Sequence, residues 1–97
     1  LLVIDNLPPI AFIEVEYPRV FGNYHARLDG SKSWDQDAKW GGSIEQFAYQ
    51  IEGLADLVSS RSQIDYIFPG PGVYVVFFRV QDNEGEWSEI VEKAVIF

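Results

Sequence analysis

The chain has 97 residues, of which 47% are apolar and 15% aromatic, and its 15 acidic and 7 basic residues give a formal net charge of −8. This length and composition predict one globular domain, and the negative charge argues against nucleic acid or an anionic lipid surface as a partner. There is no cysteine, which excludes disulfides, zinc–thiolate sites and thiol nucleophiles. No apolar run approaches the roughly 20 residues of a membrane span, so we expect no direct membrane insertion.

The chain opens with a short apolar run at 1–4, which an Asp-Asn pair and the Pro-Pro pair at 8–9 separate from the rest. Two consecutive prolines impose an extended backbone. We interpret 1–5 as a linker or the tail of a preceding repeat, because the run is similar to the chain's own C-terminus, and 6–97 as the domain. This favours a tandem array in which short linkers restrict the angle between neighbouring domains of the same chain. The alternative is an arbitrary boundary.

Apolar and polar residues alternate with a period of two in several stretches, as in strands with one buried face. In the clearest stretch, 73–82, Tyr74 and every second residue after it share a face, and an Asp-Asn-x-Gly turn follows. Residues 29–43 predict an ordered loop, and 52–60 a loop or a short helical turn. The remaining predicted strands lie within 11–16, 24–28, 47–51, 64–68 and 89–97. Six or seven short strands without helical periodicity predict an all-β, seven-stranded immunoglobulin-like β-sandwich.

Three motifs, in this order and spacing, resemble the polycystic kidney disease (PKD) domain family over nearly the whole chain. The motifs are Asn6-x-Pro8-Pro9-x-Ala11-x-Ile13, Leu28-Asp29-Gly30-Ser31-x-Ser33-x-Asp35-x-Asp37 and Tyr74-x-Val76-x-Phe78-x-Val80-x-Asp82-Asn83-x-Gly85. The chain is similar in particular to PKD-like repeats of archaeal and bacterial surface or secreted proteins. One stretch departs from the family: where members often carry Trp-Asp-Phe-Gly-Asp-Gly, this chain has Tyr49-Gln50-Ile51-Glu52-Gly53-Leu54. The two core positions are kept as Tyr49 and Ile51, but the acidic turn is lost.

The loop 29–37 holds the densest group of oxygen ligands in the chain. Calcium binds six to eight oxygens from carboxylates, carbonyls and water. Some members of the resembled family bind calcium where three such segments converge, and the resemblance implies a calcium site formed by Asn6, Asp35, Asp37 and Asp82. The alternative is that the Asp and Ser side chains of this loop, and the Asp-Asn pair at 82–83, hold turns through local backbone hydrogen bonds. No other cofactor is expected.

Trp34 and Trp40 flank the acidic loop. Exposed aromatic rings can stack on sugars or anchor a protein partner, so both are candidate binding residues. They could instead cap the open end of the sandwich. We expect capping for Trp40, whereas for Trp34 both interpretations remain. We expect Trp87 to pack on the sheet edge.

An apolar stripe, Val73, Val75 and Phe77, lies on the face of its strand opposite to the predicted core. Such a patch often marks a contact surface, which makes Val75 and Phe77 candidate binding residues. The alternative is that the chain's own segment 54–58 covers the stripe.

Catalysis finds little support in the sequence. His25 is the only histidine, and we expect it on the polar face of its strand as a solvated or cross-strand side chain rather than as a general base. A pair of catalytic carboxyl groups needs a cleft that a sandwich of this size hardly offers. We therefore expect no enzyme.

The function that we expect is a non-catalytic extracellular or cell-surface module, which acts as a spacer and contacts a protein or a glycan. One alternative is a carbohydrate-binding accessory module of a secreted hydrolase, which exposure of Trp34 and Trp40 would favour. A second alternative is a periplasmic sensor module of a two-component receptor.

Overall fold

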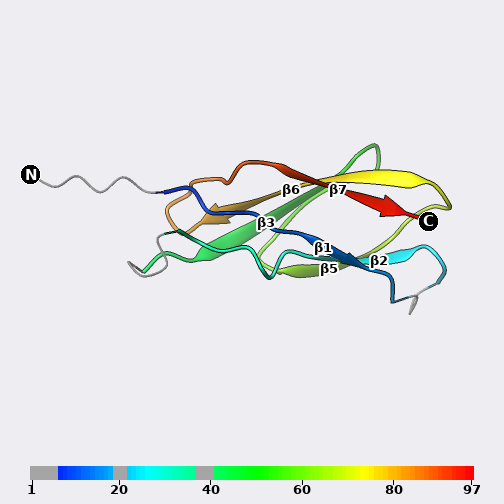
Figure 1. Cartoon of the computed structure of the whole chain (residues 1–97), viewed down its shortest axis with the longest axis horizontal. Coiled ribbons are helices and arrows are strands. Elements are labelled where there is room, and N and C mark those ends of the chain that lie inside the picture. The colour runs from blue at the N-terminus through cyan, green and yellow to red at the C-terminus, as the bar shows by residue number, and fades with distance from the viewer. Residues whose placement is uncertain (1–6, 19–21, 37–40) are drawn as a thin grey trace, which may run out of the picture.

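The computed structural model describes residues 7–18, 22–36 and 41–97. These residues form seven strands and no helix (Figure 1). The strands are β1 (Glu14–Glu16), β2 (His25–Asp29), β3 (Ile44–Ile51), β4 (Ala55–Ser59), β5 (Gln63–Ile67), β6 (Val73–Asp82) and β7 (Val91–Ile96). They pair antiparallel in two sheets with the strand orders β1-β2-β5 and β4-β3-β6-β7. The predicted seven-stranded β-sandwich is confirmed.

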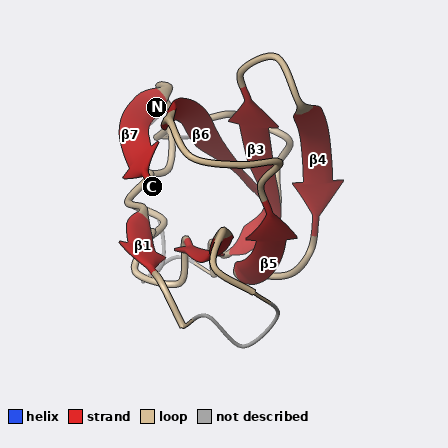
Figure 2. Ribbon diagram, turned by 90° about the vertical axis from the view of Figure 1, so that its right-hand side faces the viewer, coloured by secondary structure: helices blue, strands red, loops and turns tan. Residues whose placement is uncertain are grey.

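Seen along the long axis, the four-stranded sheet lies over the three-stranded one (Figure 2). Alternate residues of each strand point into the space between the sheets, because successive side chains of a strand point to opposite faces. The inner positions of β6 follow this rule: Val76, Phe78 and Val80 are fully buried. The other buried apolar residues of the core are Ala11, Ile13, Ala26, Leu28, Phe47, Tyr49, Ile51, Phe68 and Val95.

β4 occupies a stretch for which the sequence predicted a loop or a helical turn, and that prediction is wrong. The strand pairs with β3 from Phe47↔Ser59 to Ile51↔Ala55. Its alternation is weak, because Leu57 and Val58 are adjacent apolar residues and only one of them can face the core. Pairing with the edge of β3 therefore decides the conformation of β4.

The described chain enters at one end of the elongated sandwich and leaves at the opposite end (Figure 1). At the latter end, Phe97 and Gly72 exchange two backbone hydrogen bonds, of 2.9 and 3.1 Å. The predicted linker at 1–5 lies outside the described residues. Within those residues, no helix is long and apolar enough to cross a lipid bilayer.

Candidate functional site

The acidic loop after β2 is held by turn chemistry at its start. Asp29 Oδ1 accepts a hydrogen bond of 2.8 Å from the Ser31 amide, and Asp29 Oδ2 accepts one of 3.0 Å from Gln63. Partial burial raises the pKa of Asp29, but the hydrogen bonds from Ser31 and Gln63 and the charge of Lys32 outweigh it, so the pKa falls below its ordinary value. The turn interpretation is thus confirmed for Asp29.

The β6–β7 connection uses an aspartate in the same way. Asp82 is 2% exposed, and its Oδ1 accepts hydrogen bonds of 2.9 Å from the amides of Glu84 and Glu86. Gly85 takes a φ of 87°, which a residue with a Cβ rarely adopts. The predicted turn at Asp82 is confirmed, and its carboxylate organises that turn.

Two of the four residues predicted to bind calcium can be located. Asp35 is 4% exposed, and Asp82 is buried as described above. Asn6 and Asp37 lie outside the described residues. Among the residues that the structure describes, no three acidic or histidine side chains come together in a way that could hold a metal ion. A calcium site therefore stays a prediction that requires Asn6, Asp37 or other oxygen ligands beside the two buried carboxylates.

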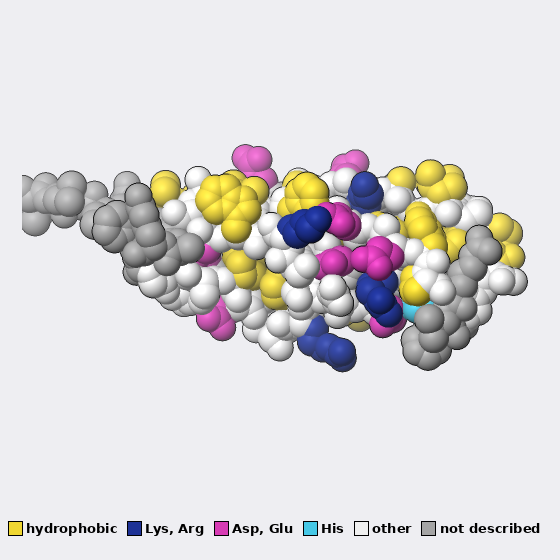
Figure 3. Space-filling view, turned by 60° about the horizontal axis from the view of Figure 1, so that its bottom comes forward, with side chains coloured by type: hydrophobic (Ala, Val, Ile, Leu, Met, Phe, Trp, Pro, Cys, Tyr) yellow, Lys and Arg dark blue, Asp and Glu magenta, His cyan; other side chains and the backbone are white. Residues whose placement is uncertain are grey.

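Trp34 is exposed, whereas Trp40 lies outside the described residues. The Trp34 side chain keeps 54% of its surface accessible, and two further large apolar side chains nearby are similarly open, Phe12 at 49% and Ile10 at 40%. Figure 3 shows that the face turned toward the viewer carries separate hydrophobic side chains beside basic and acidic ones. Phe12 was not among the predicted binding residues. The signal that could have identified it is an aromatic residue in the predicted strand 11–16 that alternates with the buried residues Ala11 and Ile13.

The outer face of the four-stranded sheet carries the other two predicted binding residues. Val75 and Phe77 are partly buried and Val73 is exposed. The segment 54–58 does not lie over this stripe, because β4 belongs to the same sheet and β3 separates it from β6. Self-coverage by that segment is thus excluded, and the contact role of Val75 and Phe77 stays a prediction.

Trp87 is partly buried and contacts residues nearer the C-terminal end of β6. It forms an antiparallel bridge with Gln81, and the Arg79 guanidinium carbon lies 4.3 Å from the centre of its ring. This is a cation–π contact, so Trp87 packs against the end of the sheet as predicted.

His25 is a cross-strand residue, as predicted, but it is fully buried rather than solvated. Its Nε2 lies 2.8 Å from Asp65 Oδ1, and Arg27 Nε donates to the same oxygen at 3.0 Å. Desolvation raises the pKa of Asp65, but the hydrogen bonds from His25 and Arg27 outweigh it and lower the pKa below its ordinary value. The three side chains form a hydrogen-bonded cluster across β2 and β5.

The two packed antiparallel sheets define the class of this protein, an immunoglobulin-like β-sandwich. No family model and no curated protein sequence matches the chain, but solved structures share its fold. A structure from a study of promiscuous specificity in carbohydrate-binding modules of the β-sandwich superfamily superposes with a TM-score of 0.79 and 22% identity, over 96% of this chain and 35% of that one. This chain thus spans about a third of that structure's length.

Two further structures match over nearly their whole length. The PKD1 domain of Vibrio anguillarum Epp has a TM-score of 0.72 and 18% identity, covering 95% of each chain. The PKD1 domain of the Vibrio cholerae metalloprotease PrtV has a TM-score of 0.69 and 17% identity, covering 93% of this chain and 96% of that one. The chain has the fold of PKD domains, as the sequence resemblance predicted. At these identities the likeness establishes the fold alone.

Proposed function

We propose that this domain is a non-catalytic extracellular module that spaces its neighbours in a larger surface or secreted protein and contacts a protein or a glycan. The observation that carries the proposal is the path of the chain, which enters and leaves at opposite ends of an elongated sandwich (Figure 1). Domains joined in this way are separated by the length of the module. The fold supports a role without catalysis, since solved structures that share it include two PKD domains and a structure from a study of carbohydrate-binding modules.

A spacer must keep its ends apart, and the sandwich is built for this. β6 is ten residues long and pairs with β3 on one side and β7 on the other. A ten-residue strand extends about 33 Å at 3.3 Å per residue. Because both of its neighbours hold it by backbone hydrogen bonds, shortening or bending the module requires breaking the sheet.

The spacer role is tested by joining two copies of the chain directly and placing one spin label in each, at a cysteine introduced at exposed Val58. We expect a narrow distance distribution by electron paramagnetic resonance, because a short linker restricts the angle between copies. The matched control inserts ten Gly and Ser residues between the copies, which should broaden the distribution. If the two proteins give equally broad distributions, the domain is not a rigid spacer.

A second candidate is a carbohydrate-binding accessory module, and the exposure of Trp34 favours it. Trp34 is exposed together with Phe12 and Ile10, and a group of exposed apolar side chains often marks a contact surface. The test is whether the isolated domain is retarded in native gels that contain soluble polysaccharides. Unchanged mobility in all of them would reject this candidate and leave the spacer role in place.

A further inference from the structure

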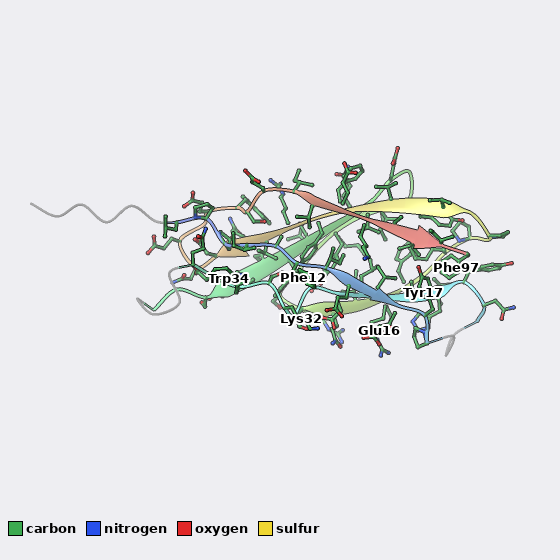
Figure 4. The ribbon with its side chains drawn as sticks, viewed as in Figure 1. Phe12, Glu16, Tyr17, Lys32, Trp34 and Phe97 are labelled. Atoms are coloured by element: carbon green, nitrogen blue, oxygen red, sulfur yellow. The ribbon has the colours of Figure 1, made fainter. Side chains whose placement is uncertain are left out.

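We propose that Phe12 and Trp34 form one flat platform that binds a neutral, β-1,4-linked polysaccharide in extended form. The inference rests on the glycan contact that is part of the proposed function, and it assigns that contact to particular residues. Figure 4 shows Trp34 and Phe12 near one another along the β1 side of the sandwich, with Lys32 close by.

The two rings share a face because of how the strands pair. Ile10 and Trp34 form an antiparallel bridge, in which Ile10 N donates to Trp34 O at 2.8 Å and Trp34 N donates to Ile10 O at 3.0 Å. Paired residues of an antiparallel bridge project to the same face, and so do residues two apart in an extended strand. Phe12 is therefore on the side of Ile10 and Trp34, while Ala11 and Ile13 are buried on the other side.

The backbone beneath the rings is held in place. Ser33 Oγ accepts a hydrogen bond of 2.9 Å from the Phe12 amide and donates one of 3.1 Å to the Phe12 carbonyl. The Ser33 hydroxyl thus satisfies the backbone N–H and C=O groups of Phe12, as a neighbouring strand would. Phe12 lies between the β1–β2 pairing and the Ile10–Trp34 bridge. The loop is anchored further by Gly30, whose amide donates to Ser62 O at 2.7 Å. A preorganised aromatic pair loses little conformational entropy on binding, which favours affinity for a ligand.

The chemistry around the rings selects the ligand. Aromatic faces give a large apolar contact area with specific geometry, and a β-1,4-linked chain of pyranose rings is a flat ribbon whose faces carry C–H groups. Beside Phe12, Lys32 Nζ and Glu14 Oε1 form an exposed ion pair of 2.6 Å, which offers a donor and an acceptor to sugar hydroxyls. The net charge of −8 disfavours uronic or sulfated chains. A neutral polysaccharide fits each of these features.

Affinity electrophoresis tests the platform, since an acidic domain migrates well in a native gel. The probes are hydroxyethylcellulose and a neutral β-1,4-xylan, with polygalacturonate as the acidic comparison. We expect retardation by the neutral polymers and none by polygalacturonate. Trp34→Ala and Phe12→Ala should each weaken the apparent affinity about tenfold, a loss of 1.4 kcal/mol, whereas Trp34→Phe should keep most of it. Trp87→Ala removes a ring from the other sheet and should bind as the unchanged protein does.

The other outcomes contradict different parts of the proposal: the position of the site, the glycan contact itself or the kind of partner. Retardation that Phe12→Ala and Trp34→Ala leave unchanged would place glycan binding elsewhere on the domain. No retardation of the unchanged domain by any neutral polymer would overturn the glycan contact together with its platform, without touching the spacer role. The domain could also self-associate in sedimentation experiments without binding any polysaccharide. If Trp34→Ala abolished that self-association, the platform would be a protein contact instead. Unchanged thermal midpoints of the variants establish that each is folded.

Ser33→Ala separates positioning from contact. The variant removes both hydrogen bonds to the Phe12 backbone but neither ring. We expect weaker binding than in the unchanged protein, with partial recovery in Ser33→Thr, whose hydroxyl can make the same bonds. Full affinity in Ser33→Ala would mean that the rings hold their positions without this hydroxyl, and the preorganisation argument would fail.

Discussion

The hydroxyl group of buried Tyr49 donates a hydrogen bond of 2.7 Å to the backbone carbonyl of Ser62. This bond joins the core of the four-stranded sheet to the corner where the chain crosses from β4 to β5 and changes sheets. Burial and the charge of Asp29 raise the pKa of Tyr49, so the hydroxyl stays protonated and able to donate. Tyr49 thus fills the aromatic core position and also fastens the two sheets together.

Tyr49→Phe should cost about 1 kcal/mol of unfolding free energy, the net value of one hydrogen bond. The loss stays small because the Ser62 carbonyl keeps its bond from the Gly30 amide. For a domain of this size the thermal midpoint should fall by about 4–8 °C per kcal/mol. Tyr49→Ala also empties a core position and should cost about 3–5 kcal/mol. Equal stabilities of Tyr49→Phe and the unchanged protein in urea titrations would show that the corner does not depend on this bond.

Gly30→Ala should destabilise the domain through a steric conflict in the core. A Cβ at this position would lie 2.3 Å from Cζ of the fully buried Phe78 ring. Overpacking of this kind costs about 1–3 kcal/mol. Gly70→Ala is the matched control, because its Cβ would meet no atom within 4 Å, and we expect it to be close to neutral.

A double-mutant cycle tests whether the clash with the Phe78 ring, rather than some other effect of replacing Gly30, destabilises Gly30→Ala. Phe78→Leu removes the far end of the ring, so the penalty of Gly30→Ala should be smaller in that background. An identical penalty in both backgrounds, measured by chemical unfolding, would show that the Phe78 ring is not the obstacle.

Asp65 should make the stability depend on pH in the acid range. Its pKa is lowered in the folded state from the ordinary value of 3.8, so its contribution is present above that pH and is lost as the pH falls through the folded-state pKa. Asp65→Asn should therefore be less stable than the unchanged protein at pH 6, and the gap should narrow at pH 3. Urea unfolding at the two pH values measures it, with Asp56→Asn as a control on the other sheet. If the difference in unfolding free energy between Asp65→Asn and the unchanged protein were the same at both pH values, the lowered pKa of Asp65 would not be the cause.

The proposed calcium site predicts a rise of the thermal midpoint in millimolar calcium relative to excess chelator. A metal that binds only the folded protein stabilises it by about 2.7 kcal/mol at a hundred times its dissociation constant. Asp35→Asn should abolish the rise. This variant is preferable to one at Asp82, because Asp82 also holds two amides of its turn. Identical midpoints with calcium and with chelator would leave the buried carboxylates as structural groups.

The seven-stranded sandwich could be predicted because each long strand has one buried face, so apolar and polar residues alternate along it with a period of two. Turn residues between the strands completed the prediction. β4 was not predicted, because a five-residue edge strand with adjacent Leu57 and Val58 shows almost no alternation of apolar and polar residues. The burial of His25 was not predicted either, since its alternation places it on an outer face and only packing from other segments can bury it.

Outside β4 and His25, the sequence by itself determined which strand side chains face the core and which turns reverse the chain, because periodicity and turn chemistry are local properties. Only the tertiary structure decided which outer residues meet. Ile10 and Trp34 are 24 positions apart, and their pairing through two backbone hydrogen bonds is what places Phe12 and Trp34 on one surface. No local pattern encodes such a pairing, because it depends on how two separate segments of the sheet come into register.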